Sequence, residues 1–276
     1  MDFTADPRTD ATLLDRLEQF YDAVPRNAAT AESHGSLTLF VGGEVSWPYY
    51  ARPTLGHPGP VTAADVQAVR ERQRALGVPE ALEWVLDTSP SMAGATSATG
   101  LAVQRCPLLA LCGTPVRPAR DPDGVQVALV SPDDPDLALV RAVADIGFGT
   151  PGTARAAAGP TERDTAARRS DPARLRRQAS QLRSGELVQA VARGADGPLA
   201  VGTYQHAQGV AEIVAVATLP SARRRGLAAL VTATLAEQAL GAGLQTVFLS
   251  AQDEIVARVY ERVGFRRVST AGIAHP

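Results

Sequence analysis

Residues 223–226, three consecutive arginines and a glycine, are better suited to a chemical role than any other stretch of this 276-residue chain. They stand between a strand-like apolar run, 211–219, and a helix-like apolar run, 227–240. The first N–H groups of a helix lack internal acceptors and lie at the positive end of the helix dipole. Arginine pairs with phosphate oxygens, and glycine lets a ligand approach the backbone. The sequence therefore predicts a pyrophosphate site. Its expected residues are Arg223, Arg224, Arg225, Gly226, Leu227, Ala228 and Ala229.

Two common nucleotide-binding loops are excluded at this turn. A Walker loop needs Gly-x-x-x-x-Gly-Lys followed by Ser or Thr, and this chain contains no lysine. A dinucleotide-binding loop needs Gly-x-Gly-x-x-Gly, whereas Gly226 is the single glycine of the turn. What remains is the spacing Arg-x-x-Gly-x-Ala, which runs from Arg223 to Ala228.

This spacing resembles the acetyl-CoA loop, Gln/Arg-x-x-Gly-x-Gly/Ala, of the GNAT superfamily of N-acetyltransferases. A short apolar strand at 245–250 follows, and then Ala-Arg-Val-Tyr-Glu-Arg-Val-Gly-Phe at 257–265. The latter is similar to the closing helix of the family, Ala-x-x-Leu-Tyr-Glu-x-x-Gly-Phe, with valine in the leucine place. The resemblance covers residues from roughly Val125 to the C-terminus. It implies acetyl-CoA as cosubstrate, with no metal.

The resemblance also implies an acid and a base. Tyr260 stands at the position of the family's general acid, close to the coenzyme sulfur. Ala-Glu-Ile-Val at 211–214 resembles the strand whose glutamate is the base in histone-type members, and Glu212 precedes Arg223 by eleven residues (223 − 212). A carboxylate shielded from water takes up a proton more readily, which suits a base. Two other interpretations stay open: Glu212 at an exposed strand end, contacting a cationic substrate or nothing, and His206 as the base.

The pantetheine arm of the coenzyme is expected beside the end of the strand that precedes the arginines. In the family this strand is splayed and carries a β-bulge near the thioester. The resemblance therefore assigns pantetheine contacts to the backbone of Val216, Ala217 and Thr218. One departure is Glu254, which stands where many members have an asparagine that contacts the pantetheine. That contact is not carried over to this chain.

Composition and charge narrow the function classes. The net charge of -2 argues against a general nucleic-acid binder, whose affinity would come from neutralising phosphates. Cys106 and Cys112 are too few for a disulfide framework, and we expect both to be buried thiols. The first residues are polar and acidic, and no apolar run approaches the roughly 20 residues that span a bilayer. A cytoplasmic protein without nucleic-acid or membrane partners is therefore expected.

The segments that position the expected site are read from apolar spacing and turn residues. The expected elements are strands at 125–130, 186–193, 199–204 and 210–218 and helices that begin near Asp134 and Asp171. Residues 148–170 are rich in Gly, Ala, Pro and Thr and show no apolar periodicity. We expect them to form a mobile loop. The resemblance to the GNAT superfamily implies that this segment borders the acceptor site, where it either orders on substrate binding or stays disordered.

The N-terminal half repeats the order of the C-terminal half. Gly77 and Gly100 end two predicted helices, as Gly241 and Gly264 do, and both pairs are separated by 23 residues (100 − 77 and 264 − 241). A strand lies between the two helices in each half. We interpret this as a diverged internal duplication.

The N-terminal copy has lost the residues of the expected site. On the same offset Thr96 stands where Tyr260 does, and Gly-Pro-Val-Thr at 59–62 stands where residues 223–226 do. Thr62 and Asp65 form a capping-box pattern instead. A hairpin is expected at 37–50, with Gly-Gly at its turn.

The expected fold class is α/β (α+β). It consists of a mixed, mostly antiparallel twisted sheet flanked by helices, the GNAT fold, present twice with the N-terminal copy degenerate. The expected domains are a degenerate N-terminal domain at 1–112, a proline-rich linker at 113–124 and a catalytic domain at 125–276.

Two functions fit these expectations. The first is an acetyl-CoA-dependent N-acetyltransferase that moves an acetyl group directly to a primary amine of a small molecule or peptide. The second is a non-catalytic acyl-CoA-binding regulator or sensor, and Glu212 and Tyr260 at their family positions favour the enzyme. Nucleic-acid binding through the arginine runs is disfavoured by the charge balance. The chain is expected as a monomer, with the N-terminal copy replacing a second subunit, or as a homodimer.

Overall fold

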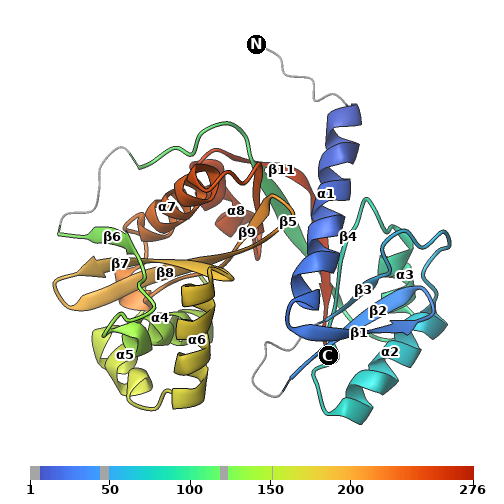
Figure 1. Ribbon diagram of the computed structural model, residues 1–276, viewed down its shortest axis with the longest axis horizontal. Helices are drawn as coiled ribbons and strands as arrows, with labels where there is room; N and C mark the ends of the chain where they lie inside the picture. The colour runs from blue at the N-terminus through green and yellow to red at the C-terminus, as the bar shows by residue number, and fades with distance from the viewer. Residues whose placement is uncertain (1–6, 44–49, 119–123, 151) are drawn as a thin grey trace. The chain divides into compact units, whose positions relative to one another are not determined.

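The computed structural model describes residues 7–43, 50–118, 124–150 and 152–276. The chain forms two compact units (Figure 1). Unit 1 comprises Met1–Leu108, Ser250–Glu254 and Arg267–Pro276, and unit 2 comprises Leu109–Leu249 and Ile255–Arg266. Strands β5 (Val103–Leu111) and β11 (Phe265–Ala274) each contribute residues to both units, so neither unit is one continuous stretch of chain.

Unit 2 contains strands in the order β10-β9-β8-β7-β6, antiparallel except for the parallel pair β9 and β10. The strands are β6 (Gln126–Leu129), β7 (Leu187–Gly194), β8 (Gly197–Ala207), β9 (Val210–Thr218) and β10 (Thr246–Ser250). The helices are α4 (Leu137–Gly149), α5 (Pro160–Ala167), α6 (Pro172–Ser184), α7 (Leu227–Gly241) and α8 (Glu254–Glu261). Figure 1 shows α7 on one face of these strands and α4, α5 and α6 on the other.

Helix α7 is mostly apolar, and most of its side chains are buried, which is typical of a helix packed into a core. It lies against β8 at Gly202, where an added Cβ would come within 2.8 Å of Val231 and 3.0 Å of Leu235. The absence of a side chain at this position is therefore what allows close helix–sheet packing. On the opposite face, Gly147 of α4 approaches Ala217 of β9 in the same way.

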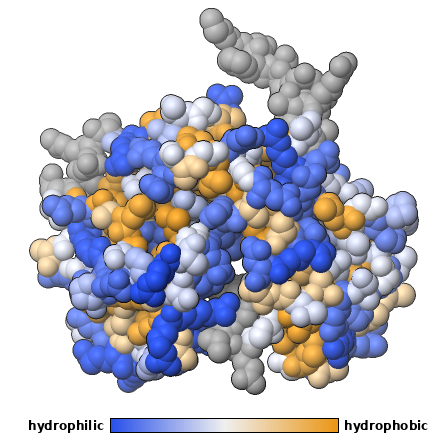
Figure 2. Space-filling model, in the orientation of Figure 1, coloured by the Kyte–Doolittle hydropathy of each residue, from blue (hydrophilic) through white to orange (hydrophobic). Residues whose placement is uncertain are grey.

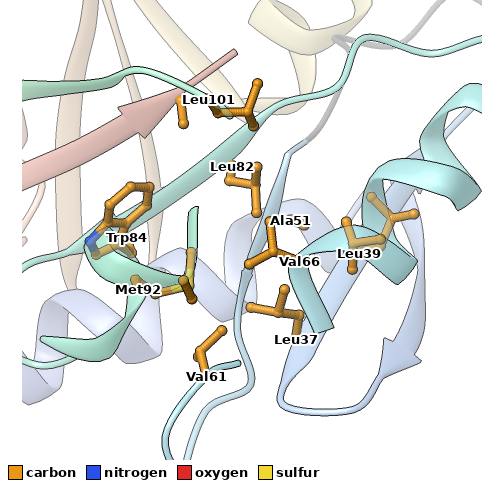
Figure 3. Close-up of a cluster of buried hydrophobic side chains, with 12 residues drawn as sticks. Leu37, Leu39, Ala51, Val61, Val66, Leu82, Trp84, Met92 and Leu101 are labelled. Atoms are coloured by element: carbon orange, nitrogen blue, oxygen red, sulfur yellow. The ribbon is translucent and has the colours of Figure 1, made fainter. Parts of the chain in front are cut away.

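Unit 1 is built around the strand order β1-β2-β3-β4-β11. Its elements are α1 (Pro7–Arg26), β1 (Ala29–His34), β2 (Leu37–Gly42), β3 (Ala51–Pro53), α2 (Ala63–Leu76), β4 (Leu82–Val85), α3 (Ser91–Ser97) and most of β5. Its core gathers buried aliphatic side chains from β2, β3, α2 and β4 around Trp84 and Met92 (Figure 3). The C-terminal residues of β11 pair with β4 and complete this sheet.

The two halves repeat the same order of elements at a constant offset. The first residues of α2 and α7, Ala63 and Leu227, are 164 positions apart (227 − 63). The first residues of β4 and β10, Leu82 and Thr246, are also 164 apart (246 − 82). In both halves the strands on either side of this helix are parallel neighbours. The structure therefore confirms the repeated fold that the glycine spacing predicted.

The N-terminus of α2 is closed by its own side chains. Thr62 accepts the N–H of Asp65, and the Asp65 carboxylate accepts the N–H of Thr62 at 3.0 Å, as the predicted capping box requires. The same carboxylate accepts the hydroxyl of Ser36 at 2.8 Å. A carboxylate thus already lies at the helix end where an anion would bind.

Close packing between β11 and β4 gives a stability prediction. A Cβ added at Gly272 would overlap the indole ring of the fully buried Trp84. We expect Gly272→Ala to lower the free energy of unfolding by about 2 kcal/mol, because overpacking of a filled core forces side chains off their rotamers. Gly241→Ala is the matched control, since nothing lies within 4 Å of its added Cβ, and urea unfolding should show no loss there. Equal stability of the two variants would contradict the packing argument.

Three sequence expectations need correction. Of the two cysteines expected to be buried, Cys106 is buried and Cys112 is exposed. Residues 148–170 are not a structureless loop, because Pro160–Ala167 form α5 with Pro160 at its first turn and a carboxylate from Glu162 on the Gly159 N–H. This helix was not predicted because α5 is short and has few apolar residues, so no apolar periodicity marks it. The predicted second strand of the 37–50 hairpin falls largely on residues 44–49, outside the described part of the chain. Instead β2 forms a hairpin with β1, which the sequence analysis missed.

Hydrophilic and hydrophobic residues are interspersed on the face drawn in Figure 2. Within the described ranges, the helices are all too short or too polar to cross a membrane.

Candidate functional site

The parallel strands β9 and β10 separate part-way along their length. Their pairing runs from Val210 and Thr246 to Glu212 and Phe248, after which β9 continues to Thr218. Beyond Glu212, β9 thus presents backbone groups on the side that faced β10. This is the kind of opening in which the arm of an elongated ligand can bond to a strand.

The predicted β-bulge lies in the same part of β9. Thr203 of β8 pairs with Val214, and Val201 pairs with Ala217, so one extra residue is inserted on β9. Ala215 absorbs it with a left-handed backbone, φ 53°, and is exposed. A non-glycine residue in this conformation is uncommon and marks a local constraint. The bulge reorients the residues predicted to contact pantetheine, Val216–Thr218.

The N-terminus of α7 is open, in contrast to that of α2. Gly226 precedes the helix with φ 79° and supplies no side-chain cap, and the first turn contains no acidic residue. The first helical bond runs from the Leu230 N–H to the Gly226 carbonyl at 3.1 Å. The N–H groups of Leu227, Ala228 and Ala229 therefore have no intrahelical acceptor. They point out of the helix with the positive end of its dipole.

Two of the three arginines flank this helix end. Arg224 and Arg225 are exposed, and Arg224 has a left-handed backbone with φ 64°. Within the part of the chain that the structure describes, neither guanidinium has a hydrogen bond or ion pair. An added Cβ at Gly226 would meet nothing within 4 Å, so the space in front of the helix is open. The turn thus combines an exposed positive charge with open backbone donors.

The third arginine has a different role from its neighbours. The Arg223 side chain is buried and donates to the carbonyls of Gly147 at 2.9 Å, Thr150 at 2.7 Å and Ala154 at 3.3 Å. The guanidinium is therefore directed at backbone carbonyls in the last turn of α4 and in the segment that follows it. The sequence expectation that all three arginine side chains meet phosphate is refined accordingly. Arg223 holds the turn in shape.

The segment after α4 is fastened to this turn by several further bonds. Arg155 donates to the Ser221 carbonyl at 3.0 Å, the Ala156 N–H to the Pro220 carbonyl at 3.1 Å, and the Ser221 N–H to the Ala158 carbonyl at 2.9 Å. Residues 152–159 therefore form a strap across η1 (Pro220–Ala222), the turn that leads into the arginines. The region that the sequence predicted to be mobile is part of the structure of the site.

The strap and the turn depend on Arg223 in a testable way. We expect Arg223→Ala to lower the free energy of unfolding by about 3 kcal/mol, because one buried and two partly buried bonds from a charged donor to backbone carbonyls are lost. Arg224→Ala should change it by less than about 0.5 kcal/mol, since that side chain is exposed. Denaturant unfolding of both variants measures the difference. Equal stabilities would show that the bonds to the strap contribute nothing.

Tyr260 on α8 is 7% exposed, and its ring meets Phe265 edge-on at 6.4 Å between centroids. Burial raises the pKa of its phenol to about 12. A phenol held in this way keeps its proton at neutral pH.

Glu212 is 7% exposed and lies in β9 at the last pair before the strands separate. The Nε2 group of Gln205 on β8 donates to its Oε2 atom at 2.9 Å. The structure thus excludes the exposed strand end as the setting of Glu212. His206, the other expected base, is exposed, and its Nε2 lies 2.8 Å from the Gly185 carbonyl.

Unit 2 holds every residue that the sequence predicted for the site. Two further parts of the site, Gln205 and the strap, were not predicted. Gln205 was not predicted because its bond to Glu212 depends on the register of β8 against β9. The strap was not predicted because its bonds join distant residues, as Arg155 and Ser221, 66 positions apart, show (221 − 155). Glu254, the departure from the family pattern, is exposed and bonds to Arg267 at 2.8 Å. No cluster of three or more His, Cys, Asp or Glu residues suited to a metal occurs in the described ranges.

Comparison with known proteins connects this geometry to a family. Residues 188–272 match the model of the FR47-like protein family. A GCN5-related N-acetyltransferase from Kribbella flavida is 25% identical, with a TM-score of 0.68 over 95% of both chains. A tandem GNAT protein from the clavulanic acid biosynthesis pathway is 16% identical, with a TM-score of 0.53 over 87% of this chain and 78% of its own.

A third similar structure is a GCN5-related N-acetyltransferase from Sphaerobacter thermophilus. It is 17% identical, with a TM-score of 0.51 over 77% of this chain and 65% of its own. A comparison with curated proteins returned no significant match. The likeness supports acyl-CoA-dependent acetyl transfer in general. The chain has the fold of the GNAT proteins, and the family-model match together with the Kribbella flavida structure supports a GNAT superfamily N-acetyltransferase.

Proposed function

We propose that this chain is an acetyl-CoA-dependent N-acetyltransferase that transfers the acetyl group directly to a primary amine, with the active site in unit 2. The observation that carries the proposal is the contrast between two equivalent helices. The Asp65 carboxylate closes the N-terminus of α2, whereas α7 has no side-chain cap and an open approach at Gly226. A helix end that is open in one repeat and closed in the other favours a single coenzyme site.

The open helix end fits the coenzyme. The N–H groups of residues 227–229 would bind the pyrophosphate, and the exposed Arg224 and Arg225 side chains would pair with its oxygens. The backbone of Val216–Thr218, beside the bulge, would bond the pantetheine arm. Arg223 would contribute by fixing the turn through its bonds to the strap. Bound acetyl-CoA would supply the acetyl group as an activated thioester.

The proton transfers fall to two buried side chains. The Glu212 carboxylate would take the proton that the acceptor ammonium loses, and the neutral amine would then form the new C–N bond. The Tyr260 hydroxyl would donate its proton to the departing sulfur. Its pKa of about 12 means that the proton is present at neutral pH. Holding both substrates beside these groups supplies the proximity term of catalysis.

We propose as acceptor a primary amine on a small molecule or a peptide. The test is release of free CoA, followed with a thiol reagent, in a panel of amino acids, aminoglycosides, polyamines and peptides with free N-termini. Amine-dependent release that is lost with Glu212→Gln would support the enzyme. Saturable binding of acetyl-CoA without release for any amine class would favour the alternative, a non-catalytic acyl-CoA-binding regulator. Absence of acetyl-CoA binding would overturn both.

A further inference from the structure

Glu212 is not alone on its face of the sheet. Gln205 and Glu212 are direct partners across β8 and β9, and the Gln205 amide donates to the Oε2 atom of the carboxylate at 2.9 Å. Gln205 is half-buried and Glu212 is buried, so water competes weakly for this bond. A side-chain amide has no charge and cannot act as an acid or a base at neutral pH. Any effect of Gln205 on chemistry must therefore act through Glu212.

We propose that Gln205 is a positioning residue for the catalytic base, and this inference rests on the proposed function of Glu212. Its amide restricts the rotation of the carboxylate through the bond to the Oε2 atom. A neutral donor has a particular advantage over an arginine here. It orients the carboxylate without the strong loss of basicity that a nearby cation causes.

The amide can serve both protonation states of the base. When Glu212 is ionised, the amide N–H donates to a carboxylate oxygen. When Glu212 has taken the proton of the acceptor ammonium, an N–H bond has broken and an O–H bond has formed, and the carboxylic acid is neutral. The amide then donates to the carbonyl oxygen of the acid or, after rotation, accepts its hydroxyl. The orientation of the base is thus retained through the catalytic cycle.

Tyr204 and His206 flank Gln205 in β8, and successive side chains of a strand point to opposite faces. The His206 ring is bonded to the Gly185 carbonyl, and burial raises the pKa of Tyr204. On β10 the residue opposite Glu212 is Phe248. A substitution at Gln205 therefore alters the bond to Glu212 without replacing an ionisable residue.

A matched control lies on the next strand. Gln189 of β7 is also half-buried and donates to the Thr203 hydroxyl at 3.2 Å, and Gln178 donates to its oxygen at 2.8 Å. No bond joins Gln189 to Glu212. Gln189→Met therefore removes a strand amide of the same kind while leaving the base untouched. Comparison with Gln205→Met separates an effect on the base from a general effect of losing a polar side chain.

The experiment measures kcat/KM against pH for the wild type, Gln205→Met, Gln205→Glu and Gln189→Met with the best acceptor of the panel. We expect Gln205→Met to lower kcat/KM roughly tenfold, since a bond to a charged group is lost. The amide favours the ionised form of Glu212, so its loss should move the acid limb to higher pH by roughly half a unit to one unit. Gln205→Glu should move it further in the same direction, because a like charge is added. Gln189→Met should leave the limb in place.

Titration of Glu212 by carbon-13 NMR gives a second measurement that does not depend on turnover. The carboxyl signal, assigned by its loss in Glu212→Gln, should titrate at higher pH in Gln205→Met than in the wild type. A variant is accepted as correctly folded if its affinity for acetyl-CoA stays within about twofold of the wild type. If Gln205→Met does not fold, the shift of the acid limb in Gln205→Glu tests the proposal instead. An unchanged acid limb and an unchanged Glu212 titration would overturn the proposal. If the Glu212 titration shifts in Gln205→Met but the protein transfers no acetyl group, the effect of Gln205 on Glu212 is supported and the proposed enzymatic function is refuted.

Discussion

Replacing Tyr260 by phenylalanine is expected to lower kcat about 100-fold or more, while the affinity for acetyl-CoA stays within about twofold, because general acids typically contribute factors of this size. The substitution removes one oxygen and keeps the ring, so the edge-on contact with Phe265 and the enclosure by α8 are preserved. The loss should appear in kcat because proton donation to the departing sulfur is needed in the transition state. Steady-state kinetics and calorimetric titration of acetyl-CoA measure the two effects separately.

The matched control is Tyr204→Phe. Tyr204 is also a buried tyrosine of unit 2, on β8, and burial likewise raises its pKa. It has no role in the proposed chemistry, so its kcat should remain within about twofold of the wild type. A loss in kcat of the same size for both variants would mean that packing in unit 2 is responsible. A wild-type rate in Tyr260→Phe would remove Tyr260 from the mechanism.

The raised pKa of Tyr260 also fixes the sign of its pH dependence. An unfolded chain ionises tyrosine near pH 10, and the folded protein holds the Tyr260 proton to about pH 12. The contribution of this neutral phenol to stability is therefore complete below about pH 10 and is lost between about pH 10 and 12. Activity should consequently show no alkaline limb caused by Tyr260 below about pH 10.

Local sequence signals were sufficient where adjacent residues determine the structure. The capping box at Thr62 and Asp65 forms because both partners lie within one helical turn. The cap of α6 at Asp171 and the turn between β7 and β8 form for the same reason. The constant spacing of the glycines near the helix ends correctly predicted a repeated fold. Gly77 caps α2 in the left-handed conformation, and Gly241 is the last residue of α7.

The remaining features depend on contacts between distant residues. Arg223 belongs to the coenzyme-loop pattern, yet its guanidinium bonds carbonyls at positions 147–154, which no local pattern reveals. The strap that it holds was expected to be mobile, because Gly, Ala and Pro carry no periodic signal. The partnership of Gln205 with Glu212 depends on the register of β8 against β9, shifted by the bulge at Ala215. Register and long-range polar contacts were thus the parts that the sequence could not supply.

A carboxylate placed at Gly226 is expected to block the coenzyme site by its charge. Gly226 has φ 79° and open space in front of its added Cβ, so Asp and Asn, which tolerate this conformation, can both be accommodated. The two side chains have nearly the same shape and differ in charge. Two like charges 4 Å apart near a protein surface repel by about 4 kcal/mol, and screening reduces this. Gly226→Asp should therefore bind acetyl-CoA at least about 30-fold more weakly than Gly226→Asn, a difference of about 2 kcal/mol.

Calorimetric titration at low and high salt distinguishes charge from shape. If the pyrophosphate binds at the open end of α7, the difference between Gly226→Asp and Gly226→Asn should shrink as salt rises to about 1 M, where the Debye length falls to about 3 Å. Gly226→Asn should stay within about fivefold of the wild type, because the backbone N–H groups of α7 remain in place. Equal affinities of the Asp and Asn variants at low salt would place the phosphates elsewhere. Both helix N-termini of the repeated fold would then be closed to the coenzyme, and the contrast with α2 would lose its meaning.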